Sequence, residues 1–109
     1  REVNEDPDTF MRYADQPMLA FVMLFVQEKT PTSEQAMAAL TRELIDAALD
    51  HGGRYYLPYR LHATPEQFQR AYPQAAEFFE LKRKYDPEEL FQNEFYVKYG
   101  TGTPKAQPK

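Results

Sequence analysis

The longest apolar run of the chain, residues 18–26, predicts a β-strand that is apolar on both faces. Such a strand normally lies in the middle of a covered sheet, because both faces need apolar neighbours. The run is far shorter than the roughly 20 residues that a helix needs to cross a bilayer, so we expect no membrane span. Its alternating positions form two sets: Leu19, Phe21, Met23 and Phe25 on one face, and Ala20, Val22, Leu24 and Val26 on the other.

Apolar positions at helical spacing then predict one long amphipathic helix over residues 33–51. Gly52-Gly53 would end this helix, because glycine readily adopts the left-handed backbone that a helix stop requires. The buried stripe is expected to contain Met37, Leu40, Leu44 and Ala48, and the outer face Glu34, Arg42, Asp46 and Asp50.

Residues 54–61 alternate like a second strand, in which Pro58 indicates an edge position or a bulge. Two short helices are expected after it, over residues 65–72 and 74–84. The acidic segment 1–16 contains at most one helical turn.

Capping residues followed by proline mark several predicted helix starts. A Thr or Asp side chain can accept a bond from the first free N–H groups, and Pro suits the next position because its missing N–H needs no partner there. Two starts also have the spacing of a capping box, with Gln three residues after Thr. The proline pairs are Asp6-Pro7, Thr30-Pro31, Thr64-Pro65 and Asp86-Pro87, and the boxes are Thr32 with Gln35 and Thr64 with Gln67.

These elements predict an α+β fold, a small sheet covered by helices, over residues 1–99, with a disordered tail at 100–109. Two strands and one long helix do not cover the doubly apolar strand 18–26. We therefore expect the sheet to be incomplete without strands from a parent polypeptide or from a second copy of the chain.

The composition limits the function classes. With 109 residues, 42% of them hydrophobic and 28% charged, the chain suits one globular domain, and its net charge of −4 argues against a nucleic-acid surface. The absence of cysteine excludes disulfides and thiolate sites, and the two histidines, His51 and His62, are too far apart in sequence to predict a metal site. A cytoplasmic location is favoured; since the chain opens with Arg1, an export signal upstream stays open.

Residues 78–99 carry the most specific pattern. A basic stretch, Lys82-Arg83-Lys84, leads into Asp86-Pro87 and then Phe91-Gln92-Asn93. This order resembles the C-terminal signature of FAD-linked oxidases of the vanillyl-alcohol oxidase superfamily. The resemblance implies the C-terminal part of a ferredoxin-like cap (substrate) domain of a larger FAD-dependent oxidoreductase. The parent would oxidise a hydroxyl-bearing small molecule, an N-terminal domain would hold most of the FAD, and this chain alone would be inactive.

Residues 54–62 correspond by this resemblance to a cap-domain strand that faces the flavin in aldonolactone and alditol oxidases, although none of the chemical identities of that motif is present. The resemblance thus places Tyr56, Tyr59 and Arg60 nearest the substrate. A tyrosine phenol can hydrogen-bond a substrate hydroxyl or assist its deprotonation, and Arg60 can hold a carboxylate or a reduced flavin. In the alternative interpretation, Tyr59 turns into a core with other alternating residues and Arg60 is solvated.

Two further residues are candidates for cofactor contact. His62 ends the predicted second strand and would reach the flavin edge; its alternative is a packing or surface role. Asn93 would either contact the flavin or hold the turn with Phe91. No glycine-rich phosphate cradle is present, so FAD binding is expected mainly from the parent. A different class of function is also open: a stand-alone α+β module that forms a homodimer or binds another protein.

Overall fold

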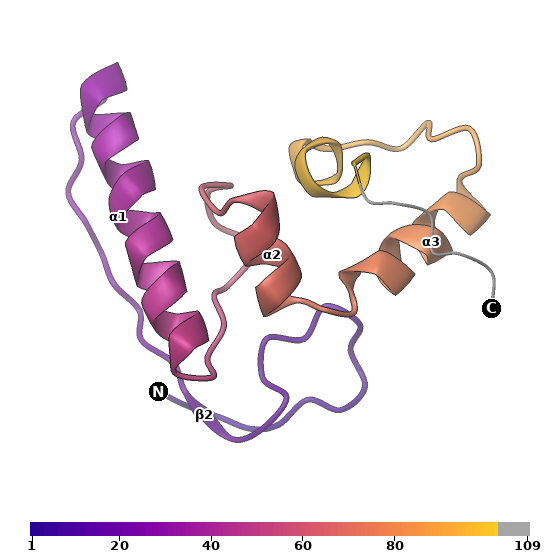
Figure 1. Cartoon of the computed structure of the whole chain (residues 1–109), viewed down its shortest axis with the longest axis horizontal. Helices are drawn as coiled ribbons and strands as arrows, with labels where there is room; N and C mark the ends of the chain where they lie inside the picture. The colour runs from indigo at the N-terminus through magenta and orange to yellow at the C-terminus, as the bar shows by residue number, and fades with distance from the viewer. Residues whose placement is uncertain (103–109) are drawn as a thin grey trace.

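A computed structural model describes residues 1–102 of the chain as an α+β arrangement (Figure 1). The long helix α1 stands at one side, α2 lies between α1 and the C-terminal turn, and α3 extends beyond it. The elements are β1 (Glu2–Val3), β2 (Met18–Leu19), α1 (Pro31–Asp50), α2 (Pro65–Ala71), α3 (Ala75–Tyr85) and the π-helix η1 (Tyr96–Gly100).

The helix boundaries follow from local capping. The hydroxyl oxygen of Thr30 accepts the N–H of Ser33 at 3.1 Å and α1 begins at Pro31, which confirms the predicted Thr30-Pro31 start and extends the predicted range 33–51 by two residues. The predicted capping box of Thr32 is therefore wrong. At the other end, Gly52 has a φ of 73°, which confirms the predicted glycine stop.

The two short helices lie within a residue or so of their predicted ranges. In α2 the predicted capping box of Thr64 and Gln67 is confirmed, because each residue's side chain accepts the backbone N–H of the other, at 3.2 and 3.1 Å. Helix α3 ends at Tyr85.

The other two Asp-Pro pairs begin turns, and their prediction as helix starts is wrong. Asp6 Oδ1 accepts the N–H groups of Asp8 and Thr9, and its segment stays non-helical. The carboxylate of Asp86 accepts N–H groups four and five residues later, across a turn in which Glu89 has a positive φ of 53°. The reaches of Asp86 are too long for a helix N-cap, which binds two or three residues ahead; those of Asp6 have the right length, but no helix follows.

The sheet contains far fewer residues than predicted. β1 and β2 pair antiparallel with Glu2 opposite Leu19 and Val3 opposite Met18. Beyond this pair, the chain runs extended along α1 without a neighbouring strand (Figure 1). The predicted strand 18–26 is therefore a strand only at its first two residues, because nothing in the described part of the chain pairs with the rest.

Residues 54–61 do not form the predicted second strand either. The segment contains a turn at residues 57–58 and a bend at 59. Pro58 lacks a backbone donor, and within residues 1–102 no strand lies beside the segment to supply a ladder. An edge strand needs such a ladder, so the alternating pattern alone is not sufficient.

The core is aromatic and is built by α2, α3 and η1. The rings of Phe68 and Tyr99 stack with centroids 4.5 Å apart, and Phe79 contacts both Phe68 and Tyr96. Gly100 allows this packing, since a Cβ there would lie 2.4 Å from the Tyr96 ring. Gly100, predicted to start a disordered tail, is thus a buried part of η1; residues 103–109 of that tail lie outside the described residues.

Helix α1 contributes little to this core. Ile45 is its one fully buried residue, and Leu40, predicted to lie in the buried stripe, is 37% exposed. The helix contacts α2 along a narrow side, and no sheet covers the predicted stripe. The other residues of that stripe, Met37, Leu44 and Ala48, are half-buried, so the stripe is partly covered, whereas most of the extended segment beside it is exposed. Among the described helices, none is long and apolar enough to cross a membrane.

Candidate functional site

The candidate site is organised around Glu34, in the first turn of α1. Its carboxylate accepts hydrogen bonds from Gln27 Nε2 at 2.9 Å and His62 Nε2 at 2.8 Å, and it pairs with the guanidinium of Arg60. These bonds, that of Gln27 foremost and then that of His62, lower the pKa of Glu34 to about 2; the charge of Arg60 adds to them. Glu34 therefore joins three segments through a persistent negative charge.

His62 is fixed on every side. Only 8% of it is exposed, and its Nδ1 lies 3.2 Å from the hydroxyl oxygen of Thr41. That hydroxyl donates its proton to the carbonyl of Met37 at 2.7 Å. The backbone carbonyl of His62 accepts the Nε–H of Arg42, also at 2.7 Å. Both ring nitrogens thus face oxygen atoms, and the imidazole serves as a structural link between α1 and residues 60–62.

Three tyrosines form a partly exposed row that ends at Tyr59, the residue before Arg60. The rings of Tyr13 and Tyr56 meet edge to face at 5.3 Å, and those of Tyr56 and Tyr59 at 5.4 Å. Tyr59 is 68% exposed, so the interpretation that sends it into a core does not hold. Arg60 is not simply solvated either, because it binds both Glu34 and Gln27 Oε1, yet more than half of its side chain is accessible.

The N-terminal loop is held against this row by Arg54. Its guanidinium donates to the carbonyl of Arg12 at 3.1 Å and forms an ion pair with Asp15 at 2.6 Å. The neighbouring Tyr55 turns the opposite way and packs on Tyr72 in the core. Residues 54–62 therefore present Tyr56 and Tyr59 outward and anchor the segment through Tyr55.

The buried tyrosines have raised pKa values because burial disfavours the phenolate. This holds for Tyr55 and Tyr72, and burial raises the pKa of Tyr99 to about 12. These three phenols stay neutral, and two of them donate: Tyr99 to the carbonyl of Ala63 at 2.8 Å, and Tyr72 to that of Tyr55. They are not candidates for proton transfer near neutral pH.

Asn93 lies in a different part of the fold. Its Oδ1 accepts the N–H of Tyr96 at 2.8 Å, which caps the C-terminal helical turn. None of the hydrogen bonds, ion pairs or ring contacts within residues 1–102 joins it to residues 54–62. The structure thus brings together Arg60 and His62 at Glu34, and Tyr56 and Tyr59 beside them, and it leaves Asn93 apart.

Sequence reasoning missed Glu34, Gln27 and Thr41 as parts of the site. Glu34 was expected on the outer face of its helix. The helical pattern does place it near that face, but the partners that turn it inward lie 26 and 28 residues away. No local spacing signals such a contact.

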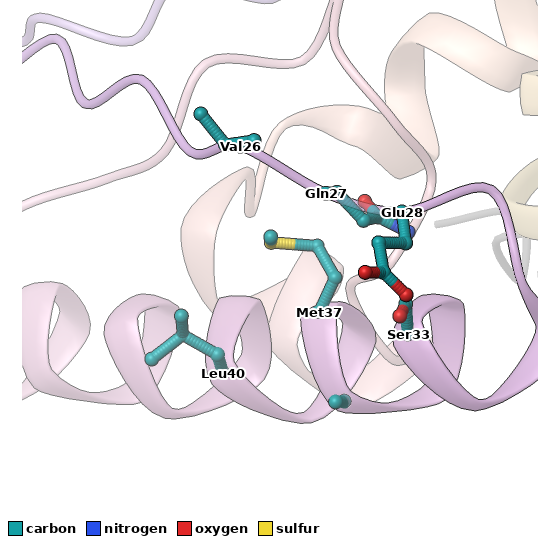
Figure 2. A pocket seen from close by; sticks show the side chains of 7 residues that line it. Val26, Gln27, Glu28, Ser33, Met37 and Leu40 are labelled. Atoms are coloured by element: carbon teal, nitrogen blue, oxygen red, sulfur yellow. The ribbon is translucent and has the colours of Figure 1, made fainter.

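An open groove of about 300 Å³ lies between the extended segment and α1. In Figure 2, Met37 reaches from the helix toward the extended chain, and Leu40 lies further along the same helix. The groove continues the partly covered apolar face of α1. Among the described residues, no group of three or more His, Asp or Glu side chains is placed to hold a metal ion.

No protein-family model, curated protein or solved structure matches this chain.

Proposed function

We propose that this chain is the C-terminal part of an FAD-dependent oxidoreductase and forms part of its substrate-site wall. The observation that carries the proposal is the outward surface of Tyr56, Tyr59 and Arg60 (Tyr59 68% exposed), which Glu34 and Arg54 anchor from behind. The order of features in residues 78–99 supports the same assignment.

The finer fold assigned by this proposal is a ferredoxin-like cap domain whose sheet the parent completes. The open apolar segment 21–26 and the partly covered face of α1 support it, because exposed contiguous apolar surface marks an interaction site. The N-terminal FAD-binding domain of the parent is the corresponding partner.

The residues of this chain do not offer a complete FAD site. No glycine-rich loop opens a helix among residues 1–102, so the parent's N-terminal domain holds the pyrophosphate. When bound, FAD supplies the hydride acceptor. The role of this chain is to bind and orient the substrate: the phenols of Tyr56 and Tyr59 hydrogen-bond a hydroxyl group, and the accessible part of Arg60 binds a carboxylate.

Two candidate residues fit an indirect role in this proposal. His62 is bound on both ring nitrogens and positions the segment that carries Arg60. Asn93 holds the turn after α3, as its bond to Tyr96 suggests. Neither needs to touch the flavin.

The test uses the intact parent enzyme, with Tyr59→Phe and Arg60→Ala as the site variants and Tyr85→Phe as the matched control. Tyr85 is 77% exposed and lies at the end of α3. Losing a substrate hydrogen bond, or the charged bond of Arg60, costs about 1–3 kcal/mol, so kcat/KM should fall roughly tenfold or more in both site variants with unchanged flavin content. Wild-type turnover in both would contradict the proposal.

A second candidate function is a stand-alone module that dimerises or binds a protein. The open segment 21–26 favours it independently of any flavin. Sequencing the reading frame upstream of Arg1 separates the two. Several hundred residues with a glycine-rich FAD-binding domain support the oxidoreductase, whereas a start codon close to Arg1 supports the module. Native mass alone does not decide, since an excised cap fragment can also pair with itself.

A further inference from the structure

Residues 21–26 have the conformation of a strand without any of its neighbours. Among residues 1–102, no hydrogen bond involves their main chain. One face of the segment is almost fully exposed, to 94% at Leu24, whereas on the other face Phe21 is 81% exposed and Phe25 only 51%. A strand that is apolar on both faces and unpaired at both edges promotes aggregation, and folded proteins normally cover such strands. We therefore expect residues 21–26 to be covered by another segment.

The register of the short sheet identifies one free edge. Arg1 and Ala20 exchange both main-chain hydrogen bonds, with the N–H of Ala20 bound at 2.8 Å and the terminal nitrogen of Arg1 at 3.0 Å. Glu2 stands opposite Leu19, so each step toward the N-terminus moves one residue further along the extended segment. A residue that precedes Arg1 and continues the line of β1 would therefore lie opposite Phe21.

We propose that the parent polypeptide immediately before Arg1 is a β-strand that continues β1 and pairs antiparallel with residues 21–26. This inference rests on the proposed function, in so far as that makes the chain part of a longer polypeptide. Pairing is one to one, so about six residues are involved. Because residues 21–26 are apolar on both faces, the incoming strand is apolar at most of its positions.

The ladder fixes which main-chain groups face this strand. Hydrogen-bonded and non-hydrogen-bonded pairs alternate in an antiparallel ladder. Since Arg1 and Ala20 form a hydrogen-bonded pair, the N–H groups of Val22, Leu24 and Val26 point to the incoming strand. Those of the residues between them point to the opposite edge.

A second copy of the chain is the less favoured occupant of this edge. β1 already occupies its beginning, and the terminal nitrogen of Arg1 is bonded in line with the ladder. A strand from a second copy would have to begin its pairing with residues 21–26 directly beside Arg1. A segment that precedes Arg1 reaches the same edge because it is covalently joined to β1.

The first measurement is residue-resolved amide hydrogen exchange on the full-length parent. We expect the amides of Val22, Leu24 and Val26 to exchange at least tenfold more slowly in the parent than in the isolated 109-residue chain. Equal exchange rates would overturn the inference. So would protection in the parent that is lost when the parent is diluted, because that result identifies a second copy as the occupant.

The second measurement fixes the register by a disulfide in the parent. The chain has no native cysteine, and opposed residues in a ladder lie within disulfide reach. The third residue before Arg1 would lie opposite Met23. A parent with Met23→Cys and a cysteine at that third residue should therefore form an intramolecular disulfide on oxidation. The matched control places that cysteine at the second residue before Arg1, which points to the other face. Cross-linking that is absent, or equal in both variants, would overturn the inference.

Flavin content is measured on the same parent. A parent that cross-links in register but binds no FAD would remove the proposed function and leave the strand pairing. A flavoenzyme without the cross-link would remove the strand pairing alone. A reading frame with no residues before Arg1 would overturn this inference directly.

Discussion

Two carboxylates, Glu34 and Asp86, hold segments that have little regular secondary structure of their own. Glu34 ties the extended chain and residues 60–62 to α1. Asp86 binds Lys82 Nζ at 2.7 Å within α3 and accepts the N–H groups of Leu90 and Phe91 in the following turn. At the scale of single residues, the candidate site depends on the anchor Glu34 as much as on the tyrosines and the arginine that it exposes.

Asp86 should make stability depend on pH. Its hydrogen bonds, that of Lys82 foremost, lower its pKa below the ordinary 3.8. A carboxyl whose pKa is lower in the folded state stabilises the fold above its unfolded pKa, and this contribution is lost as the pH falls through the folded value. Asp86→Asn, which resembles the protonated form, should therefore lower Tm at pH 7, and the difference from wild type should shrink below about pH 4.

The matched control for this prediction is Asp8→Asn, which removes the same charge from an exposed side chain. Its Tm should differ little from wild type at either pH. A Tm difference for Asp86→Asn that is as large at pH 3 as at pH 7 would show that the carboxylate charge is not the source of the effect.

Glu34→Gln should loosen the site without unfolding the molecule. The variant loses the ion pair with Arg60 and weakens the bond to His62, so residues 58–62 should open more often. Tryptic cleavage after Arg60 should be roughly fivefold faster or more. Glu43→Gln is the control, since Glu43 lies on the exposed side of the same helix. Equal cleavage in both variants would remove Glu34 as the anchor.

Residues 54–62 were selected from the sequence as candidates for substrate contact, and that role stays a prediction. Tyr56 and Arg60 were identifiable by residue type and by the position of their segment. Their anchor was not, because Arg60 and Glu34 are 26 residues apart and meet only after α1 and the following loop have formed. Local spacing does identify pairs such as Thr64 and Gln67, which are three residues apart.

At the scale of elements, α1, α2 and α3 were predictable, whereas η1 and the strands were not. Helix starts and stops are encoded within a few residues, as the cap at Thr30 and the stop at Gly52 show. A strand needs a neighbour that its own sequence does not contain. Residues 54–61 lack one among the described residues and include Pro58, so the alternating pattern ends in a turn.

Thr64→Ala tests the capping of α2, the helix that carries Phe68 into the core. Loss of an N-cap side chain costs about 1 kcal/mol, which corresponds to a Tm decrease of roughly 4–8 °C in a domain of this size. Thr32→Ala is the matched control, because Thr32 lies inside the first turn of α1 and caps no N–H group. Chemical denaturation with both variants checks the prediction; equal losses would contradict it.

At the scale of the whole molecule, the chain is open. Its radius of gyration is 15.5 Å, above the roughly 13 Å expected for a compact domain of about 100 residues. The aromatic core joins α2, α3 and η1, whereas the N-terminal strands and most of α1 lie outside it. The molecule thus combines one packed aromatic core with an exposed apolar segment at residues 21–26.

Leu24→Lys should reduce self-association of the isolated chain. Leu24 is 94% exposed, so Leu24→Lys replaces an exposed apolar side chain by a charged one without disturbing the core. Light scattering at increasing protein concentration should show less association than for wild type, with stability changed by no more than about 0.5 kcal/mol. Gln35→Lys, an equal charge change on α1, should associate like wild type. Identical scattering of the two variants would show that self-association does not involve the segment containing Leu24.

The pairing of β1 with β2 also has a consequence for the order of folding. The two strands are joined by the loop of residues 4–17, which is closed by a bond from the Asp6 N–H to the Ala14 carbonyl at 2.8 Å. An isolated two-stranded hairpin is marginally stable at best, and each of these strands has only two residues. During synthesis from the N-terminus, we therefore expect the hairpin to stay transient until α1 and Arg54 have been made, because Arg54 binds the carbonyl of Arg12 and the carboxylate of Asp15 within the loop.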